Sequence, residues 1–545
     1  MDGQHSAGGQ EVARIDGLRQ LAGGRRVVRA AAGHRLWRLL PLSLAAAAAV
    51  PALACSSASP PEAPAAPATL TIGLPQVSQL DPSLGLSTMA DLIANERLTA
   101  SDARGRTLPL LLDHWRVSAD GLSWRLTLRD GVRFRDGSPV TTADIVRTID
   151  EDRRDPRESA VCLDDITGVA AVDEHDVDVT LKRRCYFLLD DVLNTVTRAS
   201  GSGRGRVSTG PFSVVSLSAD ELVLEADPNY HEGPPIAARA VVRRYDTLRT
   251  AWADMMRGQL DFLFEVGPDS ADFLADQPSI DLHTYLSTYA NMLLLNSARP
   301  QFHTAGVRRA LNLAIDRTAL VQQAQKGHGV PATVPTWPNH WAYGTGEHGF
   351  GYDPEQAAAL LAAGRGGSRH AGAPGQPLLE FTCLIPANFA ILERLALLVQ
   401  RQLAEVDVRM RVESVPPETL DRRWRRGDFD ALLLPFLSGP YAWVPFSTWH
   451  SPGASRRWNF WGYRSAAVDA TLEALRDARD DAEFAGALRR FEAAFANDPP
   501  AVLLTWNERI QAVSHRFVVP AAADGRDGMY FVGSWSLRRP GQEQP

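Results

Sequence analysis

The stretch that most constrains the fold of this chain runs from Asp120 to Ile149. Its first part alternates between apolar and polar side chains, which is typical of a half-buried β-strand. The apolar positions are Leu122, Trp124, Leu126 and Leu128. Asp130-Gly131 and Asp136-Gly137 flank a second, shorter alternation, and each dipeptide favours a turn because glycine adopts a positive φ without strain. The stretch therefore predicts strand, turn, strand and turn.

A helix is predicted directly after the second turn. Thr141 or Thr142 caps its first turn, and Asp144 places a carboxylate near the positive end of the helix dipole. In its order of elements and in its residues, the segment resembles the signature of the family 5 extracytoplasmic solute-binding proteins. These are the peptide- and nickel-binding components of ABC importers.

Further segments carry the same resemblance over about Leu70 to Trp535. Val307 to Arg317 is similar to a family helix of the form V-R-x-A-x-x-x-A-I-D-R, and Ser208 to Phe212 is similar to a G-T-G-P-Y turn. The resemblance implies an α/β fold with two lobes, of the periplasmic-binding-protein type II, cluster C. It also implies mixed sheets, an extra subdomain in the first lobe and a hinge between the lobes.

The first 69 residues read as an export signal and a tether. A basic flank precedes an apolar run from Leu39 to Val50, and Cys55 follows small residues as in a bacterial lipobox. We predict a signal peptide over 1–54, with Cys55 as the lipidated first residue of the mature chain. The alternative is plain cleavage beside an incidental cysteine. Residues 55–69 are rich in Ser, Pro and Ala and are expected to form an extended tether.

The resemblance also sets the expected division of the body. Lobe I is expected over 70–290, with the extra subdomain at about 98–204. Lobe II is expected over 291–508, and residues 509–545 return to lobe I and end in a tail. The chain is expected to cross between the lobes near Tyr289 to Asn296.

Three cysteines lie in the body. Strand-like runs flank the sequence 173–176 and predict a hairpin, with Cys162 and Cys185 equidistant from its tip. In an exported protein such a pair favours a disulfide. Metal binding by the two cysteines would need an additional ligand, and Cys383 is expected to be buried as a small apolar residue.

The ligand contacts are expected just after an apolar strand over 430–435, where α/β lobes place their binding loops. Peptide-binding members of the family carry an aspartate there that pairs with the ammonium group of the ligand, and this chain has Gly439 or Pro440 instead. The motif Gly439-Pro440-Tyr441 is similar to the nickel-binding branch, although Leu437 stands where that branch has tryptophan.

Aromatic residues crowd this region, and aromatic faces bind apolar, cationic or sugar-like ligands. We expect two or three of them to touch the ligand and the remainder to pack in the core. The candidates are Tyr441, Trp443, Phe436, Trp449 and Trp458. The resemblance also places Glu96 near the cleft, with a solvated acid at a helix end as the alternative.

The sequence gives no support for catalysis. A nucleophile elbow, a zinc-protease motif, a phosphate-binding loop and a dinucleotide fingerprint are all absent from it. Asp316 and Arg317 are adjacent charges of the kind that form structural salt links. His328, His340 and His348 are irregularly spaced loop residues, so we expect no metal site and no cofactor. A formal net charge of -7 also argues against nucleic acid as a partner.

These observations predict an exported, lipid-anchored, monomeric receptor on the periplasmic or cell-surface side of a bacterial membrane. It would capture a small-molecule or peptide-like solute by hinge closure and pass it to an ABC permease. A lipid-tethered sensor or adaptor on the same fold, or a metal-chelate binding protein of the nickel type, are the alternatives.

Overall fold

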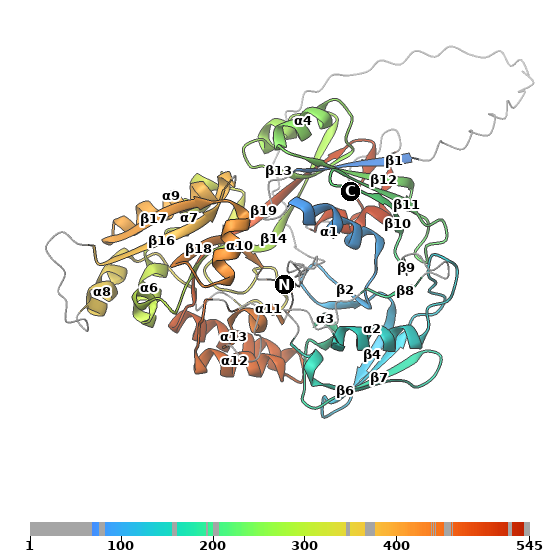
Figure 1. Cartoon of the computed structure of the whole chain (residues 1–545), viewed down its shortest axis with the longest axis horizontal. Helices are drawn as coiled ribbons and strands as arrows, with labels where there is room; N and C mark the ends of the chain where they lie inside the picture. Colours follow the sequence, from blue (N-terminus) through green and yellow to red (C-terminus); the bar gives the residue numbers. More distant parts are fainter. Residues whose placement is uncertain are drawn as a thin grey trace, which may run out of the picture.

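The structure is a computed structural model in which one long mixed sheet runs through two lobes and a subdomain has a separate sheet (Figure 1). It describes residues 68–75, 82–154, 161–191, 195–199, 206–344, 349–365, 377–387, 389–437, 439, 441, 443–451, 459, 461–521 and 526–538. The predicted signal peptide, Cys55 and Trp458 lie outside these residues.

An 11-stranded sheet runs through both lobes in the order β10-β11-β12-β1-β13-β19-β14-β18-β16-β17, with β15 paired to β19. Its strands are β1 (Ala68–Pro75), β10 (Phe212–Leu217), β11 (Glu221–Ala226), β12 (Ala237–Tyr245), β13 (Phe262–Val266), β14 (Ile280–Leu295), β15 (Gly329–Pro331), β16 (Leu379–Pro386), β17 (Val408–Val415), β18 (Ala431–Leu437) and β19 (Ala501–Ser514). Parallel pairs occur at both ends, as in β1 with β12 and in β16 with β17, whereas the central β14 and β19 are antiparallel.

Helices cover this sheet in both lobes. Those of lobe I are α1 (Pro82–Ala94), α4 (Leu248–Met256), α5 (Ala271–Ala275) and the short helix η4 (Gly528–Ser534). Those of lobe II are α6 (Ala305–Leu313), α7 (Arg317–Ala324), α8 (Pro354–Arg365), α9 (Ala390–Ala404), α10 (Pro417–Arg425), α11 (Trp443–Trp449), α12 (Ala466–Arg476) and α13 (Asp481–Asn497). Among the described residues, no helix is both long enough and apolar enough to cross a membrane.

The subdomain contains the segment from Asp120 to Ile149. Its elements are β2 (Thr99–Ser101), β3 (Thr107–Pro109), β4 (Leu112–Val117), β5 (Ser123–Leu128), α2 (Thr142–Arg154), β6 (Ile166–Ala171), β7 (Asp176–Leu181), α3 (Leu188–Asp191), β8 (Thr197–Ala199) and β9 (Arg206–Ser208). The sheet β4-β5-β7-β6 is separate from the long sheet. The first predicted strand, β5, and the helix, α2, are both present, and Asp144 accepts hydrogen bonds from the N–H and hydroxyl of Thr141 at the start of α2. The prediction of a second strand around Val132 and Phe134 is wrong, because this short stretch forms only an isolated bridge between Arg133 and Pro139. The predicted hairpin is the antiparallel pair β6 and β7.

The long strands β14 and β19 connect the two lobes, and their pairing is interrupted at one place. Leu286 pairs with Glu508 and Ala290 pairs with Trp506, so three residues of β14 face the single residue Asn507. On one side of this break β13 pairs with β19, and on the other side β18 pairs with β14. Extra residues in one strand disrupt the ladder locally and increase its twist. We call residues 286–290 and 506–508 the hinge break.

The helix predicted over Val307 to Arg317 is two helices, α6 and α7, and the prediction of one continuous helix is wrong. The Asp316 carboxylate accepts from the amide of Ala319, 3.0 Å away, and so caps the second helix. Arg317 lies just inside that helix and donates to backbone carbonyls, which include those of Ala332 and Leu503. An aspartate cap begins a new helix because its side chain satisfies an otherwise unbonded amide.

Candidate functional site

The hinge break coincides with a partly exposed polar triplet in a strand whose other residues are mostly buried. β19 is buried on either side of Asn507, Glu508 and Arg509, and these three residues are partly accessible to solvent. A strand between two lobes gains stability by burying apolar residues, so three consecutive polar residues mark the place where its surroundings change. This is the first feature of the candidate site.

Arg509 lies in a polar cluster beside the hinge break. It pairs with Tyr285 of β14, its guanidinium lies 5.0 Å from the centre of the Phe264 ring, and the Glu265 carboxylate lies 3.9 Å from the guanidinium. Burial alone would lower the pKa of Arg509, but Tyr285, Glu265 and Asp527 around it raise that pKa instead. The arginine is therefore charged at any physiological pH.

Lobe I supplies a tyrosine and an aspartate to the same cluster. The Tyr285 hydroxyl donates to Asp527 over 2.9 Å, and the Gln511 amide donates to the other oxygen of that carboxylate over 2.8 Å. Burial, with Asp527 adding to its effect, raises the pKa of Tyr530 well above its ordinary value. The cluster presents neutral phenols around a permanent positive charge.

Lobe II contributes Tyr441 to this cluster. Tyr441 is 5 % exposed and follows β18. Burial raises the pKa of Tyr289 at the hinge break, and Tyr441 lies near enough to raise it further. Tyr441 also adds to the raised pKa of Tyr530 in η4. Of the predicted ligand contacts, Tyr441 is the one that the structure places between side chains of the hinge and of lobe I.

The side chain of Trp337 packs against Gly439, two residues before Tyr441. The Trp337 indole donates to the carbonyl of Ser287 in the hinge break over 3.2 Å. A β-carbon at Gly439 would lie 2.4 Å from the β-carbon of Trp337, a separation at which something must shift. An acidic side chain at position 439 therefore does not fit this arrangement.

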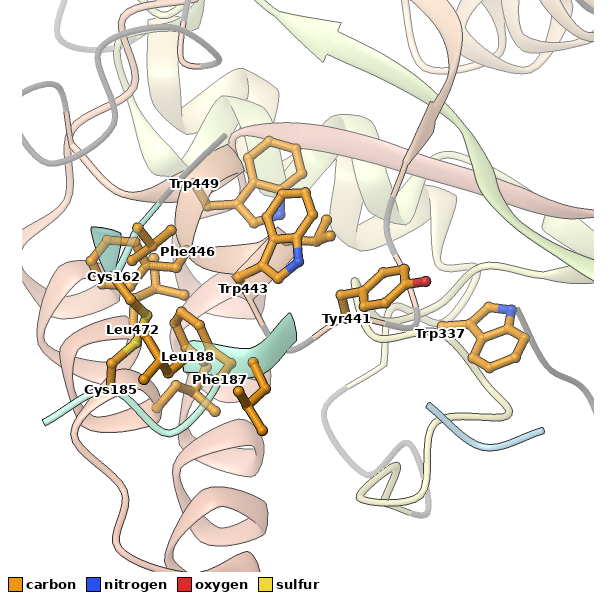
Figure 2. Close-up of a cluster of buried hydrophobic side chains, with 14 of the residues drawn as sticks. Cys162, Cys185, Phe187, Leu188, Trp337, Tyr441, Trp443, Phe446, Trp449 and Leu472 are labelled. Atoms are coloured by element: carbon orange, nitrogen blue, oxygen red, sulfur yellow. A yellow bond between two sulfur atoms is a disulfide. The ribbon is translucent and has the colours of Figure 1, made fainter. Parts of the chain in front are cut away.

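The other predicted aromatic contacts belong to a packed cluster. Trp443 and Trp449 in α11 are each 2 % exposed, and Phe436 in β18 is 5 % exposed. Phe436 meets Trp461 edge to face at 5.7 Å, and Trp449 meets Phe495 in the same way at 5.4 Å. Figure 2 shows Trp443, Phe446 and Trp449 together on one helix, with Tyr441 set apart on the side of Trp337. Their contact with a ligand stays a prediction.

Glu96 lies in a separate polar contact within lobe I. It is 1 % exposed and accepts from the Tyr230 hydroxyl over 2.6 Å. The His231 ring nitrogen Nε2 lies 3.1 Å from the other carboxylate oxygen. Both oxygens thus have partners, so any contact of Glu96 with a ligand would compete with them.

The charged and histidine residues that stood out in the sequence are buried or paired with other residues of the fold, in the case of Arg317, His340 and His328. Burial lowers the pKa of Arg317 to about 9 and that of His340 to about 3. His328 pairs with Glu508 at 2.9 Å, and His348 lies outside the described residues. Within the described part of the chain, no group of three or more His, Cys, Asp or Glu side chains has the arrangement of a metal site.

Sequence reasoning missed the Arg509 cluster. Its residues come from β13, β14, β19 and the segment after β19, so no local motif joins them. One signal was present, because Asn507-Glu508-Arg509 interrupts a strand that is apolar for most of its length. The cysteines are as expected: Cys162 and Cys185 form a disulfide, and Cys383 is free and buried.

Comparison with known proteins identifies similar sequences. The sequence model of the family described as bacterial extracellular solute-binding proteins, family 5 Middle, matches residues 106–456. A probable D,D-dipeptide-binding periplasmic protein of Escherichia coli is 23 % identical over 62 % of this chain and 67 % of its own length. The glutathione-binding protein of Salmonella typhimurium is 26 % identical over 67 % of this chain and 72 % of its own length.

Solved structures share the fold over most of the chain. NikZ from Campylobacter jejuni, in complex with Ni(L-His), superposes with a TM-score of 0.72 at 21 % identity and covers 86 % of this chain and 99 % of its own. The oligopeptide-binding protein AppA of Bacillus subtilis, in complex with a nonapeptide, gives a TM-score of 0.71 at 19 % identity and covers 87 % and 100 %.

Proposed function

The chain belongs to the bacterial extracellular solute-binding proteins of family 5, and we propose that it captures a solute by hinge closure and delivers it to an ABC importer permease. Members of this family bind solutes and do not catalyse reactions. The observation that carries the proposal is the hinge break, where the only two strands shared by both halves of the described long sheet lose their regular pairing.

We place the division into lobes at this break. Lobe I takes residues 70–290 and includes the subdomain, and lobe II takes residues 291–508. The remaining chain, 509–545, returns to lobe I, where the end of β19 pairs with β13 and the chain forms η4. Because β19 is one continuous strand across position 508, closure is expected to twist it at the hinge break. The ladders on either side of the break are expected to stay intact.

The solute is expected to contact Tyr441 and the neighbouring Arg509 cluster. A solute shifts a protein toward the closed state only by its preference for that state. Tyr441 comes from lobe II, whereas Arg509 and Tyr530 belong to the strand and tail that return to lobe I. A solute that touches both sides therefore favours closure. Trp443, Phe436, Trp449, Trp458 and Glu96 are proposed as secondary contacts.

The solute class is a small organic or peptide-like molecule. The relatives are named for a D,D-dipeptide and for glutathione, and the solved structures hold a nonapeptide and a nickel–histidine complex. Gly439 packs against Trp337, so an acid at that position cannot supply recognition of an ammonium group. A peptide-like solute would be held by the phenols, the indoles and Arg509.

Native mass spectrometry of the exported protein, purified without denaturation, is the direct test of solute capture. We expect a co-purifying molecule that is released chemically intact on unfolding. Titration with glutathione, a D,D-dipeptide and nickel–histidine then separates the solute classes. Recovery of the molecule in a chemically altered form would contradict the proposal. So would a protein that binds none of these probes and no component of a periplasmic extract.

Membrane anchoring and the partner are the finer parts of the proposal. Intact mass of the mature protein is expected to show a diacylated Cys55 at its N-terminus, and a Cys55→Ala variant is expected to leave the membrane fraction. Crosslinking in whole cells is expected to recover a permease. Recovery of a signalling protein in its place would favour the sensor or adaptor alternative.

A further inference from the structure

The subdomain contacts lobe II far from the hinge, and these contacts have a different character from the hinge strands. The subdomain segment Arg183–Leu188 lies between β7 and α3 and contacts helices α11, α12 and α13. One backbone hydrogen bond joins this segment to those helices, from the Tyr186 amide to the Arg476 carbonyl, over 2.8 Å. Its ring contacts and ion pairs with those helices are between side chains.

Aromatic side chains form the buried part of this contact. Phe187 of the subdomain and Phe446 of α11 are each 1 % exposed, and their rings lie 6.4 Å apart. Tyr186 stacks on Phe484 of α13 at 4.7 Å and donates its hydroxyl to Asp481 over 2.6 Å. Figure 2 shows Phe187 and Leu188 facing α11 and Leu472 across the boundary between the two parts.

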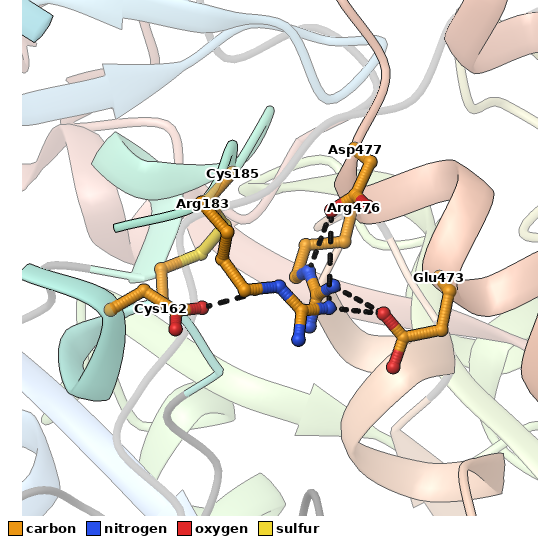
Figure 3. Close-up of a disulfide and its surroundings, with 7 residues drawn as sticks. Cys162, Arg183, Cys185, Glu473, Arg476 and Asp477 are labelled. Atoms are coloured by element: carbon orange, nitrogen blue, oxygen red, sulfur yellow. Dashed lines mark hydrogen bonds and ion pairs between the residues drawn. A yellow bond between two sulfur atoms is a disulfide. The ribbon is translucent and has the colours of Figure 1, made fainter. Parts of the chain in front are cut away.

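Charged side chains form the outer part. Arg183 pairs with Glu473 of α12, and Asp477 lies 3.9 Å from it. The side chains of these three residues are 41 %, 34 % and 45 % exposed, so water weakens their attraction. Figure 3 shows Arg183 and Arg476 together at Glu473, with the Cys162–Cys185 disulfide next to them.

The subdomain is fixed to lobe I by separate contacts. The Val196 amide donates to the Glu96 carbonyl over 3.0 Å, and the Arg135 guanidinium donates to the carbonyl of Glu225 in β11 over 3.1 Å. If lobe II rotates about the hinge break, the subdomain stays with lobe I, and its contact with α11–α13 must separate.

The disulfide lies within the contacting segment itself. Cys185 stands between Arg183 and Tyr186, and it is tied to Cys162, which precedes the short helix η1 (Leu163–Asp165). Residues 182–187 belong to no helix or strand, so apart from the disulfide their shape depends on a few turn contacts, such as the Lys182 amide with the Asp165 carbonyl. A crosslink restricts such a segment before it meets its partner.

We propose that Arg183–Leu188, the latch segment, engages α11–α13 only when the lobes are closed, and that the Cys162–Cys185 disulfide holds this segment in the shape that engages. The latch stabilises the closed form by an amount that does not depend on which solute is bound. It adds to the preference of the solute for that form and so lowers the preference that the solute must supply. This inference rests on the proposed hinge closure.

Hydrogen exchange of the full-length exported protein without added solute tests the latch. Arg183→Glu places a negative charge against Glu473 and Asp477, and like charges at an interface oppose association. Exchange is expected to rise at least about tenfold both in the latch segment and in α13, and to stay unchanged in β5. The matched control is Arg116→Glu, because Arg116 is exposed on β4 of the same subdomain and is remote in sequence from the latch.

The Cys162→Ala/Cys185→Ala variant tests the role of the disulfide. Its exchange is expected to rise in the latch segment and in α13 together, although every charged residue of the latch remains. Unchanged exchange in both variants would overturn the latch, and a rise in the latch segment without one in α13 would overturn the role of the disulfide. A rise that extends to β5 would mean that the subdomain unfolds and would overturn the proposal too. None of these exchange measurements needs a bound solute. The latch can therefore be disproved while solute capture is confirmed, and solute capture can be disproved while the latch is confirmed.

Discussion

The hinge and the latch both join the two lobes, but they do so by different physical means. At the hinge, β14 and β19 keep a backbone ladder on each side of the break, and the apolar side chains of Met292–Leu295 and Ala501–Leu504 on the lobe II side are fully buried. At the latch, rings and half-exposed charges meet across a boundary, and the Tyr186 amide donates to the Arg476 carbonyl there. The first can bend without separating, whereas the second can separate without unfolding either lobe. A receptor that closes on its solute needs one contact of each kind.

The largest expected effect comes from the hinge strands. Leu503 of β19 is fully buried beside Met292 of β14, so Leu503→Ala is expected to lower the free energy of unfolding by about 2 to 5 kcal/mol. Urea denaturation followed by circular dichroism measures this. Leu397→Ala on the exposed side of α9 is the control, and its effect should be within about 0.5 kcal/mol of zero. A loss below about 1 kcal/mol at Leu503 would mean that the hinge is not part of the cooperative core.

The disulfide is expected to contribute somewhat less to the same unfolding free energy. Cys162 and Cys185 are 23 residues apart, and closing a loop of that size restricts the unfolded chain by roughly 3 kcal/mol. Cys162→Ala/Cys185→Ala should therefore unfold at a lower urea concentration. If the urea midpoint of this variant equals that of the parent protein, the disulfide does not stabilise the fold.

Tyr441→Ala is expected to weaken solute binding at least about tenfold, equivalent to about 1.4 kcal/mol. The reason is that Tyr441 lies between the hinge and the tail of lobe I, where a solute would touch both sides. Calorimetry with the co-purified solute measures the affinity. Trp461→Phe is the control, because Trp461 is fully buried in the packed cluster and the substitution keeps a ring there. Equal affinities for Tyr441→Ala and the parent would remove Tyr441 from the site.

A surface ion pair between the lobes is expected to contribute least to the free energy of unfolding. Asp269 of lobe I lies 2.8 Å from Lys326 and 3.0 Å from Arg394 of lobe II, and these two cations lower the pKa of Asp269 below its ordinary value of 3.8. A lowered folded-state pKa means that the contribution is present above 3.8 and is lost as the pH falls through the lowered value. Because Asp269 is half exposed, Asp269→Asn should change stability at pH 7 by less than about 1 kcal/mol.

The pH dependence of that variant gives its check. Urea midpoints of the parent and of Asp269→Asn should differ slightly at pH 7 and converge in acid. The difference should also shrink at high salt, because salt screens exposed charges. A difference that grows as the pH falls would contradict the assignment.

Local patterns predicted much of the fold, because the strand, turn and helix signals between Asp120 and Ile149 lie close together in sequence. The break between α6 and α7 was not predicted. The apolar spacing from Val307 to Ile315 fits one helix, and it is Asp316 as a cap and the buried Arg317 that begin another. Sequence spacing does not show which carbonyls will surround a guanidinium.

The candidate site was predicted only in part, for a related reason. The aromatic crowding between Phe436 and Trp461 indicates burial, but ring chemistry does not say whether a side chain will meet a ligand or another ring. Phe436 and Trp449 pack against aromatic neighbours, and Tyr441 both stacks on Trp443 and lies near Tyr289 at the hinge break. The Arg509 cluster joins four distant segments, so only the folded chain brings it together.

The distance between the lobes, measured by fluorescence energy transfer, tests closure most directly. Val117 of the subdomain is 44 % exposed and Leu397 of lobe II is 51 % exposed, so cysteines introduced there can carry dyes. Cys383 will not compete, because it is fully buried and burial raises the pKa of its thiol to about 12. Addition of the co-purified solute should shorten the distance between the dyes, and it should do so less in Arg183→Glu. Saturation with that solute at an unchanged distance would contradict the account.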